Sequence, residues 1–324
     1  ALKVTGIAIP SVQINAQVFW RNAFDGPSAS LDYAFADWQL CNTFHLRLGK
    51  AKHPFGIYSE VAGLGTVRPF LNLPQVVYGP IGLVSRSYRG VGARGDLQLG
   101  QGWNLIYDVY GGGIEFEQEE SALAAISSSL DVPGVDLSFL TGFFEADDVV
   151  GARVVVAPPV DGLSAGISLY GGQADNPLDP EAERFRIFGA QLEYVVDRTW
   201  LRAEYVRGKN RIPAISDREW AAYLEAARFL TDQVQVVGLV SRLEADLTLD
   251  LPFAIPKDLT RHEEVAVGLN YWVSPEFGIK ASIHWTEGNL FSELLLEDLL
   301  LAVQTLNSPL PRTRLLQVGA QFSF

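Results

Sequence analysis

The sequence predicts an all-β protein whose strands form a transmembrane, antiparallel, up-and-down β-barrel. Three features lead to this fold class: segments in which apolar and polar residues alternate, connections that alternate between short and long, and a charged fraction of only 19% in 324 residues. Successive side chains of a strand point to opposite faces, so alternation produces one apolar and one polar face. Many alternating segments of about ten residues, separated by turn residues, are typical of barrels in the outer membrane.

Alternating segments recur along almost the whole chain. They include residues 12–20, 103–109, 163–169, 265–273, 277–285 and 315–324. The clearest is 277–285, where Phe277, Ile279 and three further apolar residues are set against polar positions such as Lys280. The last segment, LLQVGAQFSF, ends on Phe324. We expect it to be the closing strand, paired with the first.

The connections between these segments alternate in length. Short ones are predicted at 41–43, 100–102, 158–162, 196–199, 231–233 and 274–276, and long ones at 22–28, 52–85, 116–147, 174–183, 209–217, 247–260 and 289–311. Outer-membrane barrels have short periplasmic turns and long extracellular loops, whereas a soluble β-sandwich has no reason to place its long loops at one end. The count gives a single domain, residues 1–324, of about 14 strands with both termini periplasmic. Pro10, within Leu2–Arg21, or the loop 52–85 could hide further strands, so 16 strands is the alternative.

Composition excludes several other classes of protein. No apolar run reaches the roughly 18 residues that a membrane helix needs. The net charge of −13 argues against nucleic acid as a partner, and the single Cys41 excludes a disulfide within the chain. No dinucleotide fingerprint, P-loop, HExxH or CxxC motif is present, so we expect no cofactor and no metal. The chain opens with ALKVTG, and we expect a mature chain in the bacterial outer membrane from which a signal peptide has been removed.

Two stretches resemble a known family. FHLRLGKAKHPFGIYSEV (44–61) and RPFLNLPQVVYGP (68–80) are similar to bacterial porins of the phosphate-selective type and their uncharacterised relatives, as are 218–246 and 264–285. The resemblance implies a water-filled channel for passive diffusion of ions and small hydrophilic solutes. It also implies that Phe324 is recognised by the barrel-assembly machinery, and that the protein is a homotrimer surrounded by outer-membrane lipid. The chain lacks the Lys- or Arg-rich loop that phosphate selectivity needs, so no ion preference is carried over.

Charged residues on the inward face are the candidates for lining the pore, since rings of charge set selectivity. Strand parity assigns Arg21, Arg47, Arg94, Asp96, Asp108, Arg153, Arg202, Glu204 and Lys280 to that face. Arg21, Arg47 and Arg94 are expected to lie close together on one wall. The alternative interpretation is that many of these residues pair in networks that only hold the wall together.

Two loops carry further expectations. We expect the acidic loop 115–148 to fold inward, so that Glu117, Glu119 and Glu120 face the arginines across a constriction; the alternative is an acidic cap outside the barrel. The Leu-rich loop 289–311 suits a helix that packs over the barrel mouth or offers a surface to a partner.

Two other functions remain as alternatives to a channel. A structural anchor or partner-binding scaffold would have a closed lumen and would conduct no ions. A barrel hydrolase could use His284, which has Ser282 two residues away on the same inward face, or His45. Neither histidine lies in a supporting motif, so we predict that the protein is not an enzyme.

Overall fold

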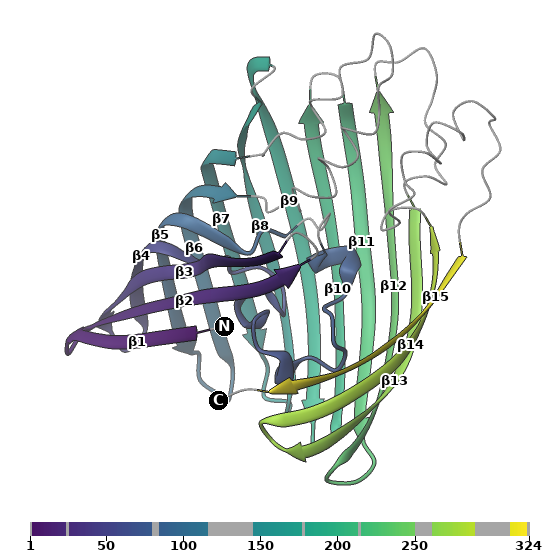
Figure 1. Ribbon diagram of the computed structural model, residues 1–324. Coiled ribbons are helices and arrows are strands. Elements are labelled where there is room, and N and C mark those ends of the chain that lie inside the picture. The colour runs from purple at the N-terminus through teal and green to yellow at the C-terminus, as the bar shows by residue number, and fades with distance from the viewer. Residues whose placement is uncertain are drawn as a thin grey trace. The chain divides into compact units, whose positions relative to one another are not determined.

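The described part of the molecule consists almost entirely of strands in one sheet. The computed structural model describes residues 2–23, 26–79, 84–115, 145–176, 179–212, 215–249, 261–288 and 312–322. Their fifteen strands follow chain order across the sheet, β1 to β15, and the residue pairings between neighbouring strands are antiparallel (Figure 1). Within these residues, no helix is both long enough and apolar enough to cross a membrane.

The alternating segments of the sequence are confirmed as strands. The strands are β1 (Leu2–Ile9), β2 (Val12–Ala23), β3 (Gly26–Cys41), β4 (Phe44–Lys52), β5 (Ser87–Gln98), β6 (Asn104–Glu115), β7 (Glu145–Ala157), β8 (Leu163–Asn176), β9 (Asp179–Val196), β10 (Thr199–Ile212), β11 (Ile215–Phe229), β12 (Val234–Leu249), β13 (Arg261–Ser274), β14 (Phe277–Gly288) and β15 (Arg312–Phe322). Three single turns of helix, η1 (Ser59–Val61), η2 (Gly65–Val67) and α1 (Gln75–Tyr78), lie between β4 and β5.

The N-terminal stretch differs from the prediction of one strand. β1 ends at Ile9 and β2 begins at Val12, and the two pair antiparallel with Leu2 opposite Val18. Pro10 causes the break because it has no N–H to donate to a sheet. The count of described strands is therefore fifteen, between the predicted fourteen and sixteen. Leu2 lies at the far end of this hairpin from its turn, so the expectation that both termini lie at the short-turn end is wrong for the N-terminus.

The short turns are confirmed, but three of the predicted long loops are wrong. Only residues 24–25, 177–178 and 213–214 separate β2 from β3, β8 from β9 and β10 from β11. The strands continue past the alternating segments and take up most of these three predicted loops. The greater part of loop 115–148 and the whole of loop 289–311 lie outside the described residues, as does Phe324, so the expectations for them stay predictions. Pairing of the last strand with the first also stays a prediction.

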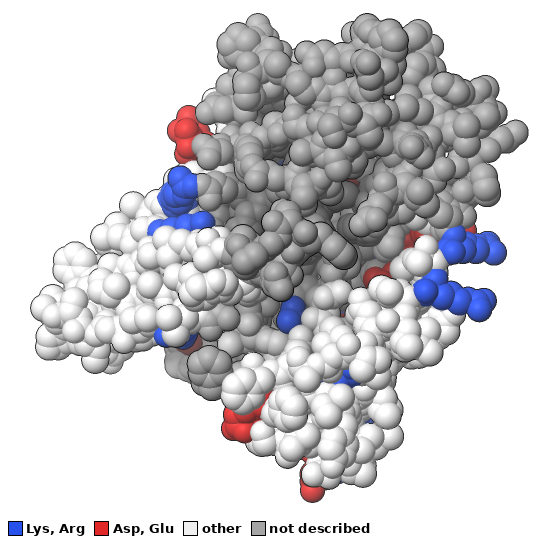
Figure 2. Space-filling model, viewed as in Figure 1, with Lys and Arg blue, Asp and Glu red and all other residues white. Residues whose placement is uncertain are grey.

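The chain divides into two compact units. The first comprises residues 1–63, 84–160 and 164–188, and the second comprises 64–83, 161–163 and 189–324. In each unit one face of the sheet exposes large apolar side chains, such as Ile167 in the first and Val267 in the second. Figure 2 shows broad uncharged surface over β1–β3 and over β13–β15, with charged side chains near the margins. We call this side the apolar face.

The opposite side, the polar face, carries the buried charged residues and is covered by the segment 53–79. Residues 53–63 lie against it in the first unit and 64–79 in the second. The sequence ends β4 here because Pro54 cannot donate to a sheet, while Gly56 has a φ of 62°, in the left-handed region. Phe55 and Tyr58, both almost fully buried, anchor the segment. The segment between β4 and β5 is thus folded onto the polar face.

Candidate channel constriction

Three arginines converge on one carboxylate in the first unit. Arg47 on β4, Arg94 on β5 and Arg153 on β7 all contact Glu60 of η1. The Nη1 atoms of Arg47 and Arg94 lie 3.3 and 2.7 Å from Glu60 Oε1, and Nη2 of Arg153 donates to Oε2. We call Glu60 and these three arginines, with the two aspartates described next, the Glu60 cluster.

Two aspartates complete the cluster from the strands. Asp108 on β6 stands opposite both Arg94 and Arg153 in the strand register, and its Oδ2 accepts bonds of 3.0 and 2.8 Å from Nε and Nη2 of Arg153. Asp37 on β3 accepts a bond of 3.1 Å from Nε of Arg47. Cross-strand register therefore sets opposite charges side by side, where they attract one another. The cluster holds three arginines and three carboxylates, so its formal charge is balanced.

The electrostatics of Glu60 follow from this arrangement. Burial alone would raise its pKa, but Arg153, Arg94 and Arg47 together outweigh burial and lower the pKa from 4.5 to about 2. Glu60 is therefore ionised at neutral pH. The charge-assisted hydrogen bonds between the Glu60 carboxylate and the three arginines hold the connecting segment on the polar face.

His53 is a second anchor of the same segment. The ring is fully buried, its Nδ1–H donates to the carbonyl oxygen of Ser85 at 3.1 Å, and its Nε2 accepts from the hydroxyl of Tyr110. The Tyr170 ring packs against it edge-on, with centroids 4.6 Å apart. Burial, more than the nearby charge of Arg153, lowers the pKa of His53 from 6.5 to about 3. His53 is therefore neutral, which suits a residue packed among aromatic rings.

In the second unit the wall holds the segment mainly through backbone carbonyl groups. Lys280 on β14 donates to the carbonyl oxygens of Gly65, at 3.0 Å, and Arg68, and to Gln321 Oε1 at 2.5 Å. Asn270 on β13 donates to the carbonyl oxygen of Pro69 at 2.8 Å. Lys280 is only 2% exposed, so its ammonium group donates its hydrogen bonds to protein groups and not to solvent.

Two further predicted residues contact the same part of the segment. Arg202 on β10 donates to the carbonyl oxygen of Val67 at 3.1 Å and pairs with Glu193 at 2.5 Å. Glu204, also on β10, accepts from the hydroxyl of Tyr78 in α1 at 2.6 Å and from that of Tyr223. Arg202 and Glu204, which the sequence predicts to line the pore, thus hold the folded segment on the polar face.

The structure thus separates the predicted site residues into four groups. Arg47, Arg94, Asp108 and Arg153 lie together in the first unit, while Arg202, Glu204 and Lys280 contact the segment in the second. Asp96 is exposed, two residues along β5 from Arg94. The side chain of Arg21 and the residues Glu117, Glu119, Glu120 and Phe324 lie outside the described part.

Glu60 is the functional candidate that the sequence prediction missed. Its signal is weak, because it is one acidic residue in a long connection that has no alternation. The aromatic residues Phe55 and Tyr58 just before it are the clue that this connection packs against the protein.

A hydrogen-bonded chain of three side chains occurs on the polar face of β13 and β14. His284 Nδ1–H donates to Glu264 Oε1 at 2.6 Å, and the hydroxyl of Ser282 donates to His284 Nε2 at 2.8 Å. All three are between 5% and 7% exposed, and the ring of Phe70 lies 5.6 Å from that of His284. His45, the other inward histidine, bonds to Asp37 at 2.7 Å.

Known proteins resemble the chain in structure and not in sequence. No family model and no curated protein sequence matches it. Similar solved structures include OmpF of Salmonella typhi in complex with daunomycin, with a TM-score of 0.57 and 12% identity over 87% of this chain and 80% of that one. The outer membrane channel DcaP of Acinetobacter baumannii has a TM-score of 0.56 and 10% identity, over 97% of this chain and 80% of that one. An anion-selective porin from Comamonas acidovorans has a TM-score of 0.53 and 11% identity, over 87% of this chain and 76% of that one.

These likenesses bear on the fold alone, because the identities are low. The narrower resemblance to phosphate-selective porins stays a prediction. The order of the strands, the two contrasting faces and the similar structures agree: the chain has the fold of the bacterial outer-membrane porins.

Proposed function

We propose that the protein is an outer-membrane channel for passive diffusion of ions and small hydrophilic solutes, with the segment 53–79 forming its constriction. The observation that supports this most is the Glu60 cluster. A segment that narrows a channel must be held firmly on the wall, and three guanidinium groups on one carboxylate do this. Charges fixed at a narrow point act on every passing ion, so they also set selectivity.

The proposed constriction is a different one from that predicted by the sequence, in which loop 115–148 supplies the acidic side of a transverse field. In the described residues, Glu60 contributes the carboxylate that the connecting segment presents to the arginines. Passage would then run beside the segment 53–79, past charges that are balanced overall but separated in space.

The test is conductance of purified protein in planar lipid bilayers under a salt gradient. The native protein should form stable open channels, and neutralising Glu60 or Arg94 should move the reversal potential in opposite directions. An anchor or scaffold protein would give no conductance at all. Native mass spectrometry of the same sample tests the proposed homotrimer, for which a monomer alone would be the contrary result. Recognition by the assembly machinery is tested by deleting Phe324 and measuring the amount of protein in the outer membrane.

A second candidate function is hydrolysis at Ser282, favoured by the chain Ser282–His284–Glu264. A serine bonded to a histidine that a carboxylate orients is the arrangement of nucleophilic hydrolases. The burial of all three side chains and the cover of Phe70 keep substrates away, and for this reason we place the channel first. Labelling by a fluorophosphonate probe that is lost in Ser282→Ala would support hydrolysis, and absence of labelling would exclude it.

A further inference from the structure

A groove lies on the apolar face of β7 and β8, beside β9, in the first unit. Its volume is about 510 Å³, which is within the range of ligand pockets, roughly 300–1,000 Å³. Val150, Ala152 and Leu169 line it, with Ala152 opposite Leu169 and Val150 opposite Gly171 in the strand register. A side chain at Gly171 would begin 2.6 Å from the carbonyl oxygen of Phe185, so this position requires glycine. The missing side chain leaves the sheet hollowed here.

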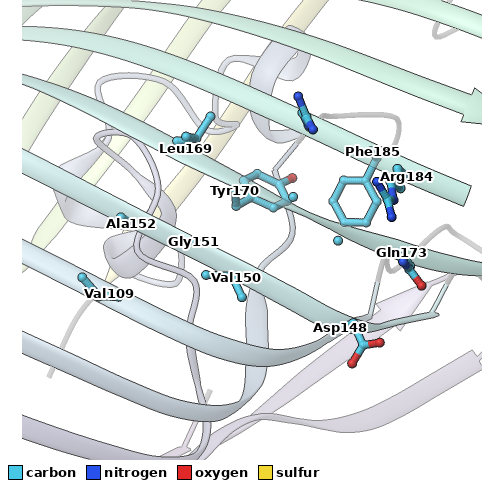
Figure 3. Close-up of a pocket in the computed structure, with 13 residues that line it drawn as sticks. Val109, Asp148, Val150, Gly151, Ala152, Leu169, Tyr170, Gln173, Arg184 and Phe185 are labelled. Carbon is cyan, nitrogen blue, oxygen red and sulfur yellow. The ribbon is translucent and has the colours of Figure 1, made fainter.

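The groove is apolar at one end and polar at the other. Figure 3 shows Val109, Ala152 and Leu169 toward one end, and Asp148, Gln173 and Arg184 toward the other. Arg186 also lines it and is exposed, as Arg184 is. In the part of the chain that the structure describes, no side chain forms an ion pair with either arginine. Among the lining residues that the structure describes, one carboxylate, Asp148, stands against two arginines, so this described set carries a positive excess.

The position of the arginines along β9 identifies what they face. Arg186 is ten residues from Val196, the end of the strand at a short turn. At about 3.3 Å per residue and a tilt of about 40°, ten residues rise about 25 Å, which is the height of the apolar band of such barrels. Outward residues closer to the short turn, Phe188 and Leu192, are apolar and exposed. Arg184 and Arg186 therefore lie where the hydrocarbon of the membrane gives way to the head groups.

Two exposed arginines on one face repel each other unless an anion lies between them. Guanidinium groups bind phosphate through two parallel hydrogen bonds, and the groove below them accepts a hydrocarbon chain. A phosphorylated lipid in the membrane leaflet on the long-loop side places its phosphate at the level of the arginines and its acyl chains at the level of the apolar end of the groove.

We propose that this groove is a binding site for such a lipid, with its phosphate on Arg184 and Arg186 and an acyl chain along Val150, Ala152 and Leu169. The inference rests on the proposed location in the outer membrane. Because the site is on the apolar face, away from the Glu60 cluster, it is independent of ion passage.

The test is a lipid titration followed by native mass spectrometry of the purified protein in detergent. The probe is diphosphorylated lipid A, compared with the same lipid after removal of its phosphates. The double variant R184S/R186S should bind the phosphorylated lipid at least tenfold more weakly and the dephosphorylated lipid no differently. Ala152→Phe, which fills the groove and keeps both arginines, should weaken both lipids. The control is R198S/R228S, which removes two exposed arginines near the short turns and should bind as the native protein does.

Several outcomes would overturn the proposal. These are unchanged binding in R184S/R186S, an equal loss in the control, or displacement of the lipid by an equal concentration of inorganic phosphate, which would indicate a site for free anions. Conductance of the same samples separates the two proposals. If native protein conducts ions but binds no lipid A, only the lipid site fails; if it binds lipid A but never conducts, only the channel fails.

Discussion

Neutralising Glu60 is the most direct test of the constriction. Glu60→Gln keeps the size of the side chain and changes the Glu60 cluster from balanced to a formal charge of +1, since three arginines then face Asp37 and Asp108 alone. Treated as a charge about 6 Å from a passing ion in water, this change is worth about 0.7 kcal/mol, favourable for an anion and unfavourable for a cation. Each effect is about threefold, so the permeability ratio of anion to cation should rise about tenfold.

The assay is the reversal potential in a planar bilayer at low salt. Arg94→Gln supplies the opposite change, because Arg94 is the most exposed of the three arginines, at 32% against 16% and 8% for the side chains of Arg47 and Arg153. It should move the potential toward cation selectivity. Glu276→Gln, at the exposed short turn 275–276, removes the same charge away from the polar face and should have little effect. Both active variants should lose their effect near 1 M salt, where the Debye length is about 3 Å.

One result would refute the reasoning about the constriction. If Glu60→Gln and Arg94→Gln leave the low-salt reversal potential unchanged, or move it in the same direction, the Glu60 cluster does not border the ion path. The segment 53–79 would then only pack against the polar face and stabilise the fold.

Three other measurements test the anchors and the two faces. Lys280→Met should cost about 1–3 kcal/mol, because carbonyl groups are left without their donor, and should expose the segment to limited proteolysis; unchanged thermal unfolding and cleavage would contradict this. Acid should destabilise the fold, because the folded state depresses the pKa values of both His53 and Glu60. The contribution of His53 to the free energy of unfolding should be lost as the pH falls from about 6.5 toward 3, and that of Glu60 as the pH falls from 4.5 toward 2. Denaturant melts at pH 7, 5 and 3 follow this, and equal stability at all three would show that neither group is coupled to folding. Ile279→Arg on the apolar face should cost about 2–4 kcal/mol near the bilayer midplane, whereas Glu276→Arg in a short turn should cost little; equal costs in a lipid-refolding titration would show that the faces are assigned wrongly.

Local alternation was enough to predict the strands and their two faces. In β14, Ile279 and Lys280 are neighbours in sequence and lie on opposite faces, as the period of two requires: Ile279 is 44% exposed and Lys280 is 2% exposed. Register then follows from short turns, so Arg94 and Asp108 could be expected side by side on adjacent strands. The sequence allowed a break at Pro10. Whether the strands before and after Pro10 pair with each other was decided by the structure, in which they do.

The contacts of the long connections depended on the tertiary structure. Glu60 and Arg153 are 93 residues apart, and nothing in the sequence favours this carboxylate over the many acidic residues of loop 115–148 as the partner of the arginines. The segment 53–79 is held on the polar face by the burial of Phe55, Tyr58 and His53, whose partners include strands distant in the chain. The strand pattern is a property of each residue and its neighbours, and it can be predicted from them. The contacts of Glu60 depend on long-range packing, and for that reason only the folded structure shows them.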